Sequence, residues 1–430
     1  MIEVFILIWL LLVLVLTFYR IEWGVSLFLA YLILVPVMRF SFNGLELGEN
    51  IFNFIFLFGY FSHANKRGYK TQWKPFIPFL TYFFLLLVIM PFQGEVPLNI
   101  MLNQWRVDIM RTLILPFVIW NLIANDILYI KIFRNTFLVS ISIAVVYGLF
   151  LTTTGGFNPY IMSLTGFTNV NDLSGYYAAE GSGRMFGRIS SVFVHPMQYA
   201  LFIGFSFVYI FQLCKKTNIY IIVLLVSLGI SAITCGVRSV LGGLAVTIVY
   251  YLMKIHNYKV VFVAIIIAVV VNHIIGSIPE LSAYMGSMVD FNNESESVGG
   301  SSFDMRLYQL NGAINEASKN PIFGLGYGWT GYYHAIHGDH PICLAFESLI
   351  FIIICNWGLV GGFIWCVLLF LYFRNYRNMN IDDIVLLDCL IVFYVVYSCI
   401  TGEYGYMRYF ALFYILMLGN SIECKKVSLR

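Results

Sequence analysis

The sequence has little charge for its length. Of its 430 residues only 11% are charged, whereas 60% are hydrophobic, and the formal net charge is +3. An ordinary soluble domain carries charge on about a quarter of its residues, so this composition excludes one and indicates an integral membrane protein. The small net charge argues neither for nor against nucleic acid, and we expect no nucleic-acid partner.

Paired cysteines and a secretion signal are also missing. The eight cysteines lie mostly in apolar segments and never in CxxC spacing, so we expect neither a disulfide framework nor a metal site from them. The first apolar segment lacks a basic n-region and a small-residue cleavage site. We therefore expect it to be a retained helix rather than a signal peptide.

Apolar runs are what the sequence does contain, and about 20 such residues cross a hydrocarbon core of roughly 30 Å. We predict an all-α, polytopic transmembrane helix bundle of roughly 12 to 14 spans, a single integral membrane domain over residues 1–430. The candidate spans are 3–18, 24–38, 50–62, 76–91, 109–124, 133–152, 191–213, 218–234, 238–254, 259–276, 347–372, 383–400 and 406–421.

Two polar segments, 154–190 and 277–346, interrupt these runs, and we expect both to be extracytoplasmic loops, the larger one catalytic. With the larger loop outside, 16 of the 25 basic residues fall inside and nine outside, in agreement with the positive-inside rule. Eight of the nine outer residues are arginines, which bind phosphate oxygens in pairs as lysine cannot. The outer face is therefore expected to bind an anion, although single arginines there can also snorkel or pair with carboxylates.

Three outer arginines fall at or near expected helix starts. Arg188 precedes span 191–213, Arg238 opens span 238–254, and Arg306 lies in the first turn of a loop helix expected over 304–319, after N-cap candidates in Ser301-Ser302-Phe303-Asp304. The positive end of a helix dipole disfavours arginine unless an anion is shared. We predict a phosphate or pyrophosphate site made of these three arginines. A local pair between Asp304 and Arg306 is the alternative.

The end of the larger loop interleaves glycines with aromatic residues and histidines, from Gly324 to His340. Glycines let the backbone approach a ligand and flat rings stack on sugars. We expect sugar contacts from Tyr327, Tyr333, His334 and His337. The spacing of His334, His337 and His340 could suggest zinc, but Gly338-Asp339 and Pro341 argue against a helix that would aim all three at one ion, so no metal is expected.

Glu347 immediately precedes the apolar run from Ser348 to Phe373, so it should lie at the outer membrane boundary near the arginines. A half-buried carboxylate there suits a general base that deprotonates a sugar hydroxyl, although an acidic residue at a helix start can also be only a cap. His340 is the rival base, because neutral imidazole needs less tuning. The outer face has no DxD or ExD pair, which disfavours a metal-bound nucleotide sugar as the donor. A lipid pyrophosphate donor needs no metal or cofactor if arginines neutralise its leaving group.

Three motifs carry a resemblance to a known family, which covers the second half of the chain best. Gly187–Pro196 places an arginine before an apolar-proline entry to a span, Cys235–Ser239 is a short turn with arginine, and Arg306–Gly328 combines an arginine, an amphipathic helix and Asn-Pro-x-x-Gly-x-Gly. In these motifs the chain resembles the bacterial O-antigen polymerase (Wzy-type) and O-antigen ligase superfamily of lipid-linked glycan transferases. Glu347-Ser348 stands where ligases place His-Asn before Gly-Leu-x-Gly, here Gly358–Gly361, and this departure favours a polymerase.

The resemblance implies a fold like the GT-C type glycosyltransferases, located in the bacterial inner (plasma) membrane with the site facing the periplasm or cell exterior. It implies undecaprenyl-pyrophosphate-linked oligosaccharides as donor and acceptor, inversion at the anomeric carbon, no metal, and O-antigen or capsular polysaccharide as product. Membrane lipids and a chain-length regulator protein are the further partners expected.

Two alternatives stay open. The first is a ligase that moves the finished glycan to another acceptor. The second is a polysaccharide lipid flippase or transporter, which the sequence disfavours because transporters place charges at the bilayer midplane in broken helices and keep outer loops short. Apart from Asp388, the charged residues of the predicted spans lie within three residues of a span end.

Overall fold

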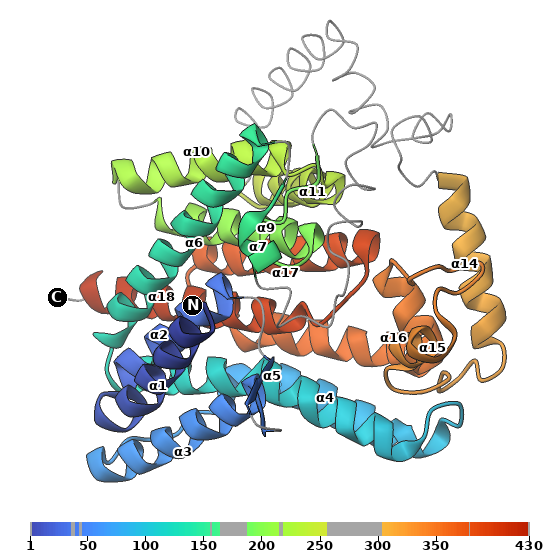
Figure 1. The fold of residues 1–430 in the computed structure, drawn as a ribbon, viewed down its shortest axis with the longest axis horizontal. Helices are drawn as coiled ribbons and strands as arrows, with labels where there is room; N and C mark the ends of the chain where they lie inside the picture. The colour runs from blue at the N-terminus through green and yellow to red at the C-terminus, as the bar shows by residue number, and fades with distance from the viewer. Residues whose placement is uncertain are drawn as a thin grey trace, which may run out of the picture.

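A computed structural model describes residues 2–35, 39–42, 45–154, 157–163, 187–214, 218–255, 303–377 and 379–428. These residues form a bundle of long helices (Figure 1). Within the described ranges, six helices are long and apolar enough to cross a membrane, and three shorter apolar helices accompany them. The chain is therefore a multi-pass helical membrane protein, as the composition predicted; the finer count of roughly 12 to 14 spans stays a prediction.

The helices follow the apolar runs of the sequence. They are α1 (Ile2–Tyr19), α2 (Ile21–Leu34), α3 (Glu49–Arg67), α4 (Ile77–Ile89), α5 (Leu98–Asn125), α6 (Tyr129–Thr153), α7 (Pro159–Ser163), α9 (Pro196–Leu213), α10 (Ile219–Thr234), α11 (Arg238–Lys254), α14 (Phe303–Ala317), α15 (Trp329–His337), α16 (Leu349–Asn375), α17 (Ile381–Thr401) and α18 (Met407–Ser428). Two 3₁₀ turns, η1 (Lys74–Phe76) and η2 (Met90–Phe92), flank α4. Strands β1 (Arg39–Phe42) and β2 (Leu45–Gly48) pair antiparallel.

Every predicted span except 259–276, which lies outside the described residues, coincides with one of these helices. Two starts were predicted wrongly. Helix α5 begins at Leu98 rather than near 109, because its first turns are amphipathic instead of uniformly apolar. Helix α9 begins at Pro196 rather than 191, because proline suits the first helical position and the His195 ring caps it, accepting from Met197 N–H at 3.1 Å.

The loop helix expected over 304–319 is α14, Phe303–Ala317, so its position is confirmed. Residues 290–302 of the polar loop, including the N-cap candidates Ser301 and Ser302, lie outside the described residues. Helices α14 and α15 lie at one end of the bundle, beside the start of α16, and the C-terminus lies at the opposite end (Figure 1).

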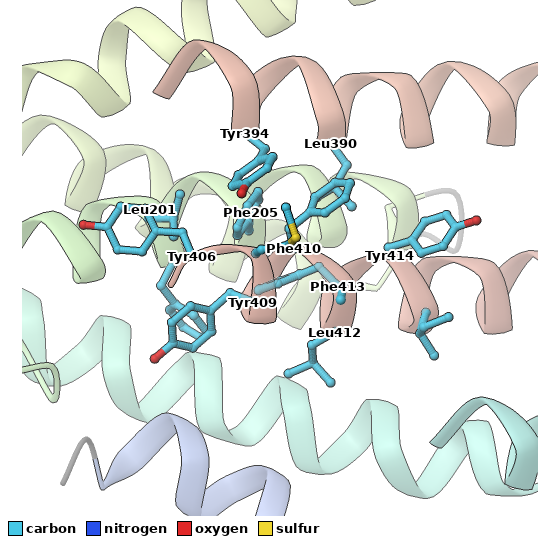
Figure 2. Close-up of a cluster of buried hydrophobic side chains, with 14 of the residues drawn as sticks. Leu201, Phe205, Leu390, Tyr394, Tyr406, Tyr409, Phe410, Leu412, Phe413 and Tyr414 are labelled. Carbon is cyan, nitrogen blue, oxygen red and sulfur yellow. The ribbon is translucent and has the colours of Figure 1, made fainter. Parts of the chain in front are cut away.

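Helix α18 is the buried centre of the bundle, packed against α5, α6, α9 and α17. Figure 2 shows its rings meeting side chains from α9 and α17. The rings of Phe410 and Tyr394 stack with centroids 4.9 Å apart, and Phe413 contacts Phe205 at 5.3 Å. Because lipid tails are as apolar as these side chains, such contacts stabilise the bundle through close packing rather than through release of water.

Helix α16 is broken at Gly358, whose backbone (φ 60°, ψ −153°) is not helical. The break separates the carbonyls of Cys355 and Asn356 from the N–H groups of Leu359 and Val360, their usual partners four residues on. Residues 320–326 replace both lost pairs with four hydrogen bonds: Leu325 N–H to Cys355 O (2.8 Å), Gly326 N–H to Asn356 O (3.3 Å), Leu359 N–H to Pro321 O (3.0 Å) and Val360 N–H to Ile322 O (3.0 Å). We call this contact the α16 join.

The Gln93 side chain, which follows η2, braces the join. Its Nε2 donates to Phe323 O at 2.6 Å and to Asn356 O at 2.9 Å, and its Oε1 accepts from Tyr327 N–H at 3.0 Å. Within a membrane span, irregular backbone is tolerated only where other protein groups form hydrogen bonds with it. Here the buried side-chain amide of Gln93 forms hydrogen bonds with three backbone groups. The Asn-Pro-x-x-Gly-x-Gly motif and the Gly-Leu-x-Gly motif are therefore in direct contact.

The α16 join should be intolerant of a side chain at Gly324. A Cβ there would lie 2.4 Å from Trp357 N, and the residue has φ +76°, which L side chains rarely adopt. We expect Gly324→Ala to destabilise the protein by about 2 kcal/mol or more, measured as thermal unfolding in detergent. Gly362→Ala on the same helix, with no atom within 4 Å of its added Cβ, is the control. Equal melting temperatures for the two variants would contradict this account of the join.

Candidate functional site

A cavity of about 1080 Å³ lies between α4, α5, α15, the start of α16, residues 188–198 and the turn before α18. All of its lining loops come from the face that the basic-residue distribution assigned to the outside. Four of the predicted site residues line it: Arg188, Tyr327, His334 and Glu347. The remaining five, Arg238, Arg306, Tyr333, His337 and His340, are not part of its lining.

Three arginines from distant parts of the chain line the cavity. Arg111 belongs to α5, Arg188 to the segment before α9, and Arg408 to the first turn of α18. The Arg408 guanidinium lies 4.6 Å from the ring centroid of Tyr409 and donates to the hydroxyl of that tyrosine at 2.9 Å, which restrains its orientation. Planar guanidiniums converging on one cavity favour a ligand with two phosphate groups.

Carboxylates also line the cavity, and each has donors of its own. Asp108 accepts from the Tyr327 hydroxyl at 2.8 Å and from Gln104 Nε2 at 2.9 Å. Glu403 accepts from Met407 N–H at 2.8 Å, from Gly405 N–H at 3.2 Å and from the hydroxyl of Tyr394 at 3.2 Å. Glu403 therefore closes the turn that places Arg408 on the cavity wall.

Glu347 lies beside Arg306 at the cavity edge. Arg306 Nη2 is 3.2 Å from Glu347 Oε2, and Arg306 Nη1 donates to Glu347 O at 3.1 Å and to Gln309 Oε1 at 3.0 Å. One guanidinium thus fixes both the backbone and the side chain of Glu347. The two side chains keep 27% and 34% of their surface exposed, so the carboxylate stays accessible from the cavity.

Glu347 does not cap α16. The N-cap is Ser348, whose Oγ accepts from Ile350 N–H at 3.3 Å. The alternative that Glu347 serves only as a cap is therefore wrong. The other alternative, a pair between Asp304 and Arg306, concerns a side chain outside those that the structure describes.

His340 is poorly placed to act as a base. Its side chain is only 4% exposed, and its Nδ1 accepts from Ile342 N–H at 3.1 Å and from Cys343 N–H at 2.9 Å. The proton of the neutral ring is therefore on Nε2, which lies 3.6 Å from Glu316 Oε1. With Nδ1 occupied and Nε2 protonated, the ring has no lone pair for a substrate, so the geometry favours Glu347 over His340.

The glycine-aromatic segment contributes one wall of the cavity. Burial raises the pKa of Tyr327 well above its usual value, so its hydroxyl stays protonated and donates to Asp108. Trp357 lies between Tyr327 and Tyr82, with ring centroids 6.1 Å and 6.2 Å away, and these three rings form an aromatic floor. Such a surface suits a sugar face.

Other predicted residues of this segment have different surroundings. Tyr333 packs its ring against Trp329 and His340, both at 5.2 Å between centroids, and His337 contacts the same ring at 4.8 Å. His334 lies 3.2 Å from Asp339. Helix α15 ends at His337 with Gly338 as its C-cap, so the three histidines do not share one helix face, and the part of the chain that the structure describes has no His, Cys, Asp or Glu cluster suited to a metal ion.

Arg238 is the first residue of α11, as predicted, but it lies outside the cavity lining. Arg188 lines the cavity although it does not adjoin a helix start, because α9 begins only at Pro196. The helix-start argument therefore selected Arg188 for the wrong reason. It also led away from Arg111, which lies in the interior of α5.

Sequence reasoning missed Asp108, Arg111, Glu403 and Arg408. A signal for all four is present, because each is an ionisable residue within or at the end of an apolar span. Asp108 and Arg111 are one helical turn apart in α5, and Glu403 and Arg408 flank the start of α18. Charged residues at such positions mark functional sites by default.

No family model matches the sequence, and no curated protein matches it. The fold and the cavity define the class: a multi-pass helical membrane protein whose charged and aromatic cavity lies where its helix-connecting loops meet.

The pKa of Glu403 yields a prediction about pH. Burial is the main cause that raises it above the usual value of about 4.3. At a pH between the usual pKa of the unfolded chain and the raised pKa of the folded protein, Glu403 is protonated only when the protein is folded. The free energy of unfolding therefore falls as the pH rises through this window. Glu403→Gln does not titrate there, so we expect wild type to lose stability relative to this variant as pH rises, measured by thermal unfolding. A difference independent of pH from about 4 to about 8 would contradict the prediction.

Proposed function

We propose that the protein is a glycosyltransferase that polymerises undecaprenyl-pyrophosphate-linked oligosaccharide repeat units into O-antigen or capsular polysaccharide at the outer face of the bacterial inner membrane. One observation carries the proposal: a single cavity unites Arg111, Arg188 and Arg408 with the carboxylate of Glu347. Arginines and a carboxylate are what transfer from a pyrophosphate donor to a sugar hydroxyl requires.

The arginines bind the donor. During transfer the bond between the anomeric carbon and the pyrophosphate oxygen breaks, and its electron pair leaves with the lipid pyrophosphate. Guanidinium groups placed beforehand around that oxygen stabilise the developing charge without reorganising, which is the largest electrostatic task in such a reaction.

Glu347 activates the acceptor. Its carboxylate takes the proton of the acceptor hydroxyl as the hydroxyl oxygen forms a bond to the anomeric carbon from the face opposite the leaving pyrophosphate, which inverts that centre. Arg306 acts as a positioning residue here, since two of its hydrogen bonds hold Glu347 at the cavity edge and a third, to Gln309, orients the guanidinium. This role differs from the pyrophosphate contact that the sequence predicted for it.

The cavity has room for both sugars. Its volume of about 1080 Å³ reaches the upper end of the range of roughly 300 to 1,000 Å³ that single small ligands occupy. Tyr327, Tyr332 and Trp357 also line it and supply ring faces and edges for sugars. Two oligosaccharide ends can therefore meet between the arginines and Glu347.

A second candidate is a lipid flippase, and two observations favour it more than the sequence did. Helix α16 is broken at Gly358, and Asp108 and Arg111 place charges inside α5, both features that transporters use. Purified protein in liposomes, supplied with a lipid-linked repeat unit, separates the candidates. Products longer than one repeat support polymerisation, translocation without transfer supports a flippase, and transfer to a different lipid acceptor alone supports a ligase.

Glu347→Gln should abolish chain growth in that assay. Loss of a general base costs about 10² to 10⁴ in rate, so we expect products to fall at least about a hundredfold while the protein stays folded in the membrane. Glu95→Gln is the matched control, because Glu95 is exposed, lies on the same face and does not line the cavity. Wild-type product lengths from Glu347→Gln would overturn the role of Glu347.

Arg111→Ala should weaken donor binding. Hydrogen bonds to charged groups contribute about 1.5 to 3 kcal/mol each, so we expect the KM for the lipid-linked donor to rise at least about tenfold. Arg106→Ala is the control: it removes an arginine from the same helix that is exposed, donates to Asn103 and lies outside the cavity lining. Equal KM values for the two variants would contradict the assignment of Arg111.

A further inference from the structure

A second, small cavity of about 20 Å³ adjoins the large one. Arg111 and Arg408 line both cavities, so these two residues lie between the two spaces. The rest of the small cavity is apolar: Leu32 and Ile33 from α2, Leu115 and Pro116 from α5, and Tyr409 and Leu412 from α18. We call this contact between α2 and the α5–α18 pair the seam.

Helix packing at the seam is sparse between α2 and α5. Helices α5 and α18 pack extensively on each other, whereas α2 packs mainly on α1 and α6 and touches α5 over few residues. Figure 2 shows Leu412 on the side of α18 that faces α5, away from the ring cluster formed with α9 and α17. Leu32 is half-buried, so the seam borders the outer surface of the bundle.

The chemistry of the seam suits an amphiphilic ligand better than a purely anionic or a purely apolar one. A free pyrophosphate needs the guanidiniums but not the small apolar space, and a hydrocarbon needs the apolar space but not the guanidiniums. A lipid pyrophosphate uses both, because its phosphates and its chain are covalently joined at the point where Arg111 and Arg408 separate the two spaces. Half-buried arginines beside an apolar wall suit the charged end of such a ligand.

We propose that the seam binds the first isoprenoid units of the lipid donor and is the path by which the chain reaches the bilayer. This inference rests on the proposed function and adds the location of the lipid. The space of about 20 Å³ is smaller than an isoprenoid unit, so the proposal requires the seam to widen when the chain binds.

The test compares two probes on purified protein: farnesyl pyrophosphate, which has a chain, and inorganic pyrophosphate, which does not. We expect wild type to bind farnesyl pyrophosphate at least about tenfold more tightly. Leu32→Trp, which fills the seam, should remove that advantage and leave inorganic pyrophosphate binding within about twofold. Leu34→Trp is the matched control, since Leu34 is a half-buried leucine of the same helix that lines neither cavity.

The two probes separate the possible failures. If wild type binds neither probe, the arginine site and the proposed function both fail. If wild type binds the two probes equally, or if Leu32→Trp behaves like Leu34→Trp, the seam proposal is overturned while the arginine site stands. Because a misfolded variant would lose both probes, Leu32→Phe provides a milder filling in that case, and it must show the same selective loss.

Discussion

The α16 join is the interaction on which the rest of the structure depends. A helix broken at Gly358 leaves two carbonyls and two N–H groups of a candidate membrane span without their helical partners, and residues 320–326 supply all four. This exchange fixes the loop to the bundle, since an unsatisfied backbone group in hydrocarbon costs several kcal/mol. Tyr327, directly after that loop segment, is thereby held where its hydroxyl reaches Asp108 on α5.

The join also orders the chemistry of the cavity. It fixes α15 and the start of α16 against the bundle, so that Glu347 lines the same cavity as arginines from α5 and α18. Arg306 reaches Glu347 from α14, a helix that itself packs on α16. The side that we propose for the acceptor is thus built from the loop and α16. The side that we propose for the donor is built from α5, α18, the segment with Arg188 and the seam.

The sequence predicted the helices well because hydropathy and length are local properties; α10, expected at 218–234, spans Ile219–Thr234. Of the residues that it predicted for the site, Arg188, Tyr327, His334 and Glu347 line the cavity, although Arg188 was chosen for a helix start that lies elsewhere. Arg111 and Arg408 escaped because a single sequence does not tell which faces of distant helices meet. His340 looked equivalent to Glu347 until the turn at Ile342 and Cys343 was seen to occupy its Nδ1.

The central claim is that Arg111, Arg188 and Arg408 form one pyrophosphate site facing Glu347. The most direct measurement is an experimental structure of the protein in lipid with undecaprenyl pyrophosphate bound. The account predicts both phosphates within hydrogen-bond distance of these guanidiniums and the chain leaving between α2 and α5. Phosphates bound instead at Arg238, or anywhere outside the cavity, would contradict it.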